Sequence, residues 1–172
     1  MARPEYDTET IRDLVEGNLS WEETRDIITS KKDADRFETY IEVKQNLVPW
    51  DDPILLPLGE HLYIVQNEDG SRPVKCDCGY EFCEYTKNWK MDAVVYVRDN
   101  RESLQKLYPE RMSCDPEWMV LREYYCPECA AQLEVEAVAP GYPIVFDFLP
   151  DLETFYCEWL DRELPDPNQA TA

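Results

Sequence analysis

The sequence is poor in the residues from which enzyme sites are usually built. Its 172 residues include one histidine, His61, and only five glycines. It has no glycine-rich phosphate loop and no G-x-S-x-G nucleophile elbow, the short motifs typical of nucleotide binding and of hydrolases. His61 follows Gly59 and Glu60 at the expected start of a strand, with no nucleophile or paired carboxylate at catalytic spacing, so we expect it to be structural. The chain therefore lacks the groups needed for catalysis on its own.

Basic residues and long apolar runs are scarce too. Lysine and arginine total 17 against 37 aspartates and glutamates, a formal net charge of −20. Nucleic-acid modules concentrate basic residues on one face, so nucleic acid is excluded as a partner. No uncharged apolar run reaches the roughly 18 residues of a membrane span, and residues 1–5 lack the apolar core of a secretory signal. We expect neither membrane insertion nor export. This charge suits a solvated surface, or one that docks on a basic patch of a partner.

Helical signals dominate the first part of the chain, residues 1–49. Hydrophobic residues make up 44% of the sequence and aromatics 12%, which is a globular composition. Gly17 closes a first short helix, and Ser20 to Glu23 has the form of a capping box that opens a second. A third helix begins near Asp33 and ends before Pro49. We expect an N-terminal helical arm.

Residues 50–149 favour strands, and residues 150–172 a helix with a tail. The extended runs predict a small antiparallel sheet with one inserted helix over 101–108. After Asp151, an apolar stripe from Leu152 to Leu160 predicts a C-terminal helix, and the tail from Pro165 has nothing to bury. The expected class is α+β, with the strands at 54–58, 61–66, 73–76, 91–98, 119–125 and 132–139.

The strongest chemical signal is a pair of short cysteine motifs. Seven cysteines, an odd number with four in close pairs, suit thiolate chelation in a reducing cytoplasm better than a disulfide framework. Two tight turns that each present two sulfurs satisfy the tetrahedral preference of Zn²⁺. The predicted ligands are Cys76 and Cys78 from one motif and Cys126 and Cys129 from the other, giving a zinc-ribbon-like sheet.

Several alternatives remain open for these cysteines. Cys83 is near enough to Cys78 to replace one ligand of the first pair, and 47 residues separate Cys78 from Cys126, more than in a compact ribbon. Cys126 and Cys129 also have the spacing of a redox pair, although strand-like residues follow them instead of a helix. Four thiolates accept iron as well as zinc. Isolated cysteines are usually small buried hydrophobes, which is what we expect of Cys114 and Cys157.

Several further stretches form a recognisable series along residues 8–162. In order they are Pro49-Trp50-Asp51-Asp52, Ile54 to Gly59, Cys76 to Cys83, Asn88-Trp89-Lys90, Tyr108-Pro109, Arg122 to Cys129, Tyr142-Pro143, Phe155-Tyr156 and Glu158-Trp159-Leu160. Together they resemble the gamma subunit of acetone carboxylase. One departure is Ala130-Ala131 after Cys129, where the family pattern leads us to expect glycine.

The resemblance implies a place in a larger assembly. In that family, a small zinc-bearing chain braces two larger hydantoinase-like subunits, alpha and beta, in a hetero-oligomer expected to be hexameric. The larger chains would hold ATP, Mg²⁺ and Mn²⁺ and convert acetone and bicarbonate to acetoacetate. A relative acting on acetophenone has a similar organisation, so the ketone stays open. Two other functions remain: a free-standing zinc-ribbon adaptor, and a small iron–thiolate electron carrier.

Overall fold

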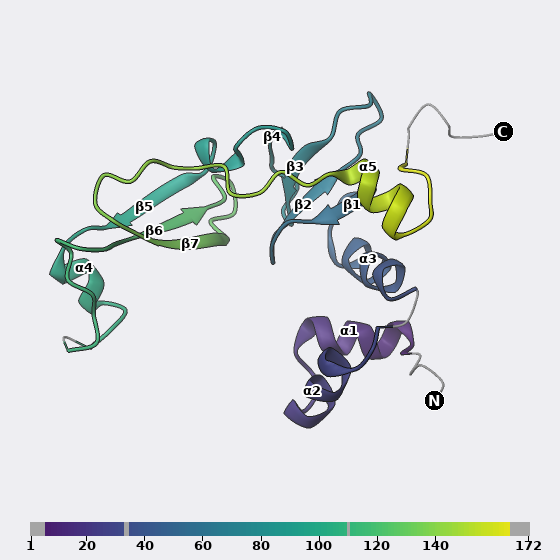
Figure 1. The fold of residues 1–172 in the computed structure, drawn as a ribbon, viewed down its shortest axis with the longest axis horizontal. Helices are drawn as coiled ribbons and strands as arrows, with labels where there is room; N and C mark the ends of the chain where they lie inside the picture. Colours follow the sequence, from purple (N-terminus) through teal and green to yellow (C-terminus); the bar gives the residue numbers. More distant parts are fainter. Residues whose placement is uncertain (1–5, 33–34, 110, 166–172) are drawn as a thin grey trace. The chain divides into compact units, whose positions relative to one another are not determined.

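The computed structural model describes residues 6–32, 35–109 and 111–165, and its helices and antiparallel strands confirm the α+β class (Figure 1). The chain forms two compact units, residues 1–51 and 52–172. Boundaries at residues 49 and 149 stay predictions. None of the helices in the described ranges has the length and apolarity needed to cross a bilayer.

The N-terminal unit contains three helices, α1 (Thr8–Glu16), α2 (Trp21–Thr29) and α3 (Arg36–Leu47). The capping box predicted from the sequence is present, because Ser20 and Glu23 each accept a hydrogen bond from the other's backbone amide. Gly17 closes α1 with φ of +74°. The predicted start of the third helix, at Asp33, lies outside the described residues. One apolar residue of each helix is fully buried, namely Ile11, Ile27 and Val43.

The C-terminal unit contains two antiparallel sheets where the sequence predicted one. The first has the order β1-β2-β3-β4, and β4 was not predicted. All four residues of β2 and of β3 are buried, which makes these strands the centre of this sheet. Its strands are β1 (Ile54–Pro57), β2 (Leu62–Val65), β3 (Pro73–Cys76) and β4 (Glu81–Glu84).

The second sheet has the order β5-β6-β7, with strands Val94–Arg98, Val120–Tyr125 and Gln132–Val138. The predicted strand 91–98 begins only at Val94. Met91 belongs instead to a 3-10 turn, η1 (Trp89–Met91), in which Asn88 caps the amide of Lys90. The inserted helix α4 (Arg101–Gln105) ends earlier than predicted.

The C-terminal segment is attached to the first sheet. After an irregular stretch, α5 (Leu152–Thr154) continues as a turn of π-helix, η2 (Phe155–Trp159). Leu152 is packed with Leu55 and Ile64, and the Tyr156 hydroxyl donates to the Leu55 carbonyl at 2.8 Å. The predicted helix is therefore present and packs on the sheet. Most of the predicted tail lies outside the described residues.

One apolar cluster joins the two sheets. It consists of Leu62 and Val74 from the first sheet, Trp89 from η1 and Tyr124 from β6. The Trp89 and Tyr124 rings meet edge to face, with centroids 6.0 Å apart. This cluster holds together the two hairpins, β3–β4 and β6–β7, that carry the paired cysteines.

Candidate metal centre

The first cysteine pair lies in the turn of the β3–β4 hairpin. Cys76 is the last residue of β3, and its amide donates to the Tyr80 carbonyl at 2.9 Å. The Gly79 amide donates back to the Cys76 carbonyl, also at 2.9 Å. Gly79 has φ of +100°, a conformation that a glycine adopts without steric cost. The turn thus presents the sulfurs of Cys76 and Cys78 on one loop.

The second pair lies in the β6–β7 turn and repeats this pattern. The Cys126 amide donates to the Ala131 carbonyl at 2.9 Å, and the Ala130 amide donates to the Cys126 carbonyl at 3.0 Å. Cys129 occupies the position that Cys78 has in the first turn. The second turn differs by one additional residue between its cysteines.

The residue after the second cysteine has positive φ in both turns. In the first turn it is Gly79, and in the second it is Ala130, with φ of +59°. An L-residue in this left-handed region is strained because its Cβ approaches the following carbonyl oxygen. The family pattern led us to expect glycine here, and the backbone has the conformation that glycine favours. The departure noted in the sequence is therefore a local strain and leaves the turn intact.

The structure brings the four predicted ligands together. The sulfurs of Cys76 and Cys129 are 3.7 Å apart, as are those of Cys78 and Cys126. All four sulfurs lie within 4.8 Å of one another. Four sulfurs at about 2.3 Å from a tetrahedral Zn²⁺ would be about 3.8 Å apart, so this donor set fits a thiolate-bound metal. Iron in the same geometry fits the same distances.

Burial divides the four thiols between an inner and an outer side. Cys76 and Cys126 are buried, whereas Cys129 is exposed. Burial raises the pKa of the Cys76 and Cys78 thiols. Burial would also raise the pKa of Cys129, but hydrogen bonds from the Ala131 amide and the neighbouring thiols lower it. Of these three thiols, Cys129 is therefore the one that loses its proton to a metal ion most readily.

His61 supports the first turn through a carboxylate partner. Its Nδ1 atom lies 2.5 Å from Oδ2 of Asp77, the residue between the two cysteines. The Asp77 amide also donates to the His61 carbonyl at 3.2 Å. The expectation that His61 is structural agrees with these contacts. No local pattern predicted this pair, because the two residues are 16 positions apart along the chain.

The remaining cysteines lie outside the group of four sulfurs. Cys83, the rival ligand, belongs to β4 and packs against the apolar cluster that joins the sheets. Burial and the nearby Asp92 raise the pKa of Cys83 to about 11. Cys114 is half-buried, and its thiol donates to the Met119 carbonyl. The expectation of burial was wrong for Cys157, which is exposed; in η2 the buried residue is its neighbour Tyr156.

Comparison with known proteins gives consistent matches. The family model described as acetone carboxylase gamma subunit matches residues 48–160. The acetone carboxylase gamma subunit of Xanthobacter autotrophicus is 45% identical over 168 residues, which cover 97% of this chain and 99% of that protein. The acetophenone carboxylase beta subunit of Aromatoleum aromaticum is 30% identical over 80 residues, or 45% of this chain and 62% of that protein. With a matching cysteine-bearing unit and near full-length similarity, this chain belongs to the acetone carboxylase gamma subunit family.

Proposed function

We propose that this chain is the structural, zinc-holding subunit of a cytoplasmic, ATP-dependent acetone carboxylase that converts acetone and bicarbonate to acetoacetate. The catalytic groups, with ATP, Mg²⁺ and Mn²⁺, would lie in two larger hydantoinase-like subunits, alpha and beta, in a hexameric assembly. This chain would contribute Cys76, Cys78, Cys126 and Cys129 to one zinc ion and no catalytic residue. Acetone is preferred to acetophenone because of the longer and closer match to the acetone carboxylase subunit.

The observation that carries the proposal is the origin of the four sulfurs. Two come from the β3–β4 turn of one sheet, and two come from the β6–β7 turn of the other. A metal bound there ties the two sheets together, so the free energy of metal binding stabilises the fold. All four tetrahedral positions would be filled by thiolates, which leaves no position open for a substrate or a water molecule, as is usual for structural zinc.

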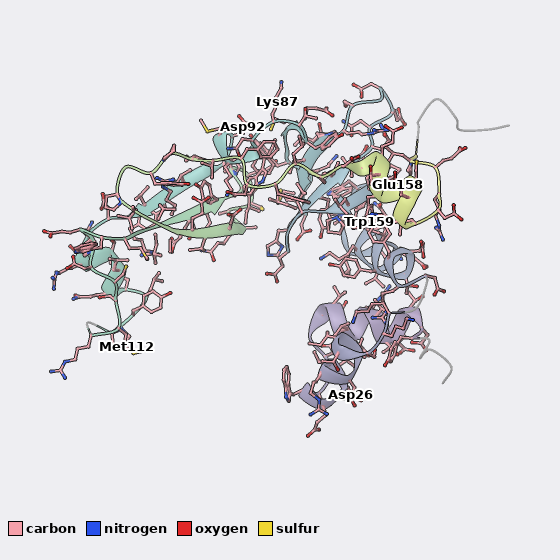
Figure 2. The ribbon with its side chains drawn as sticks, in the orientation of Figure 1. Asp26, Lys87, Asp92, Met112, Glu158 and Trp159 are labelled. Atoms are coloured by element: carbon pink, nitrogen blue, oxygen red, sulfur yellow. The ribbon has the colours of Figure 1, made fainter. Side chains whose placement is uncertain are left out.

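The C-terminal unit also exposes large apolar side chains, as expected of a subunit that binds other proteins. Met112 and Trp159 are 74% and 75% exposed, and both project from the ribbon (Figure 2). Trp118 is 79% exposed. Large exposed apolar side chains such as these are typical of protein interfaces, in which tryptophan is often among the residues that contribute most.

Co-expression with the two larger subunits tests the proposal. We expect a tag on this chain to recover both partners in one complex with ketone-dependent ATP hydrolysis. We expect the larger subunits without this chain to lose assembly or activity. Purification of this chain alone, while the two partners form an active enzyme without it, would refute the proposal.

Metal analysis tests the zinc assignment separately. We expect one zinc per chain, no visible colour and loss of the metal in a Cys76→Ser variant, with retention in Cys83→Ser. A red protein containing iron would instead favour the electron carrier.

A further inference from the structure

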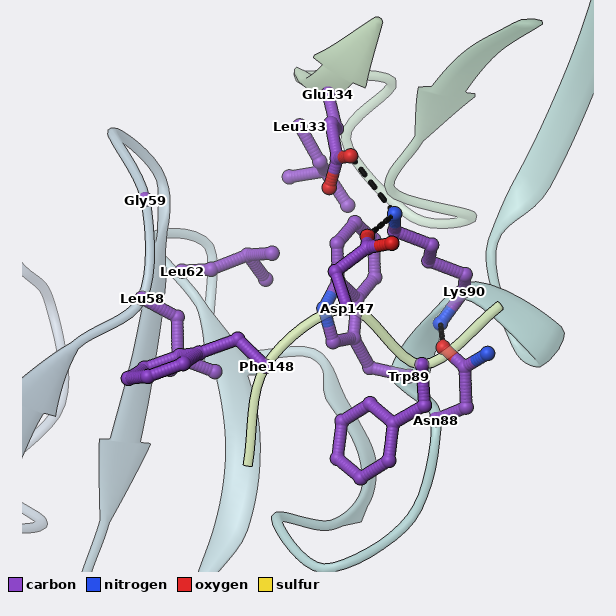
Figure 3. A pocket seen from close by; sticks show the side chains of 11 residues that line it. Leu58, Gly59, Leu62, Asn88, Trp89, Lys90, Leu133, Glu134, Asp147 and Phe148 are labelled. Atoms are coloured by element: carbon purple, nitrogen blue, oxygen red, sulfur yellow. Dashed lines mark hydrogen bonds and ion pairs between the residues drawn. The ribbon is translucent and has the colours of Figure 1, made fainter. Parts of the chain in front are cut away.

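A small pocket lies at the junction of the two sheets, and none of the four paired cysteines lines it. Its volume is about 90 Å³. The apolar walls are formed by Leu58 after β1, Leu62 of β2, Trp89 of η1 and Phe148 of the C-terminal segment (Figure 3). Gly59 stands at its edge and is exposed. A pocket of this size accommodates about one long side chain.

The floor of the pocket is charged. The ammonium group of Lys90, of which only 2% is exposed, donates to Glu134 at 2.7 Å, to Glu136 at 2.6 Å and to Asp147. Figure 3 shows Glu134 and Asp147 converging on this nitrogen. The Tyr124 ring lies beneath it, 5.3 Å from the nitrogen. Lys90 therefore occupies the centre of the three carboxylates, which excludes a metal ion from that position.

The carboxylates outnumber the cations around them. Among the residues that the structure describes, the cation in contact besides Lys90 is Arg122. Its Nη1 is 3.7 Å from Glu136, and its guanidinium also donates to the backbone carbonyls of Tyr142 and Pro143. Three negative charges thus face two positive charges. The uncompensated charge faces solvent, since the side chains of Glu134 and Asp147 are 35% and 47% exposed and both line the pocket.

We propose that this pocket receives an arginine or lysine side chain from one of the larger carboxylase subunits; this inference rests on the proposed function. The apolar walls suit the aliphatic stem of such a side chain, and the excess carboxylate charge suits its cationic end. The rim extends beyond what a small amine would cover, because Phe146 and Phe148, which both line the pocket, are 38% and 62% exposed. A protein surface buries such a rim, and the net charge of −20 favours a basic partner surface.

A blocking variant tests the pocket without disturbing its charges. At Gly59 a Cβ atom would meet nothing within 4 Å, and φ is not in the left-handed region, so Gly59→Trp places a bulky ring at the mouth without backbone strain. Gln105→Trp is the matched control, because it adds the same ring at an exposed residue of α4. Each variant competes with differently tagged wild-type chain for limiting co-expressed larger subunits.

We expect Gly59→Trp to enter the complex at least about tenfold less than wild type, because losing a buried interfacial charge contact typically costs that much. Gln105→Trp should enter as wild type does, and both variants should keep full metal content. A second variant, Asp147→Asn, retains the shape but removes the excess charge, and should reduce both incorporation and its sensitivity to salt. Equal incorporation of Gly59→Trp and Gln105→Trp would overturn the pocket proposal while leaving the proposed function intact. That result is expected if the pocket binds a small soluble amine instead of a side chain of a partner subunit.

The occupant can be identified directly. A benzophenone amino acid at Gly59 in the assembled complex should cross-link to a segment of a larger subunit that contains arginine or lysine within two or three positions. Cross-linking to a segment without a basic residue, or no cross-link in an assembled complex, would overturn the proposal. Absence of any complex with wild-type chain would refute the proposed function itself, and the pocket inference with it.

Discussion

Replacement of Ala130 by glycine should stabilise the protein. Ala130 has φ of +59° directly after the last cysteine of the second turn, the place that Gly79 occupies in the first. Its amide donates to the Cys126 carbonyl at 3.0 Å, so the turn cannot relax without losing that hydrogen bond. Glycine removes the Cβ atom and with it the strain.

The magnitude follows from two opposing effects. The left-handed conformation costs an alanine about 1–2 kcal/mol. Glycine relieves this strain, but its greater conformational freedom in the unfolded chain lowers the stability by about 0.4–1 kcal/mol. The expected net gain for Ala130→Gly is therefore about 0.5–1 kcal/mol, which corresponds to a rise in Tm of about 1–4 °C for a chain of this length. The reverse change, Gly79→Ala, should cost about 1 kcal/mol or more.

The neighbouring residue supplies a control. Ala131 is not among the described residues with positive φ, so Ala131→Gly should only add unfolded-state freedom and lower Tm. Thermal melts of the metal-loaded chain at one fixed zinc concentration compare the variants, because bound metal shifts Tm by mass action. If Ala130→Gly lowered Tm as much as Ala131→Gly, the assignment of strain to this turn would be wrong.

Three further predictions concern the cysteines and the buried lysine. Loss of metal in Cys76→Ser should lower Tm far more than any change in Cys83→Ser, as zinc-dependent melts would show. At pH 8 iodoacetamide should modify exposed Cys157 and spare Cys83, whose pKa of about 11 keeps it a thiol. Mass spectrometry of the labelled protein measures the order of modification, and faster labelling of Cys83 than of Cys157 would contradict the prediction. Lys90→Met should leave Glu134 and Asp147 without their cation at a cost of about 1–3 kcal/mol, because both carboxylates are partly exposed and Glu136 keeps Arg122. Burial would lower the pKa of Lys90, but its three carboxylates raise it overall. The contribution of Lys90 to the free energy of unfolding should therefore be complete below the unfolded pKa of about 10.4 and diminish as pH rises above that value. Denaturant unfolding of wild type and Lys90→Met from about pH 7 to 11 measures this, and a stability difference that stayed constant with pH would contradict it.

Local signals in the sequence predicted the elements well. The capping box at Ser20 and the glycine cap at Gly17 depend on residues within one turn of helix, and both are present. The cysteine motifs were also readable, because each pair lies in one short turn. Which four sulfurs come together could be stated only as a preference over Cys83, since that outcome depends on how the two sheets pack.

Long-range features escaped prediction for the same reason. The four residues of β4 are too few to show a strand period, and nothing local indicates that the strands divide into two sheets. The partners of Lys90 lie 44 to 57 positions away along the chain. Its side chain reads from the sequence as an ordinary surface lysine, and only the packing of η1 against β7 reveals it as the centre of a charge cluster.

The division of the cysteines between two hairpins has a consequence during synthesis. Paired sulfurs are 48 and 53 positions apart, so at about 5–20 residues per second the first two leave the ribosome roughly 2 to 10 s before the others. Until then a nascent chain offers a metal ion only two of the four proposed ligands. A prematurely terminated product that lacks the second hairpin would never complete this coordination shell, so a tightly held ion would distinguish finished copies from incomplete ones before assembly.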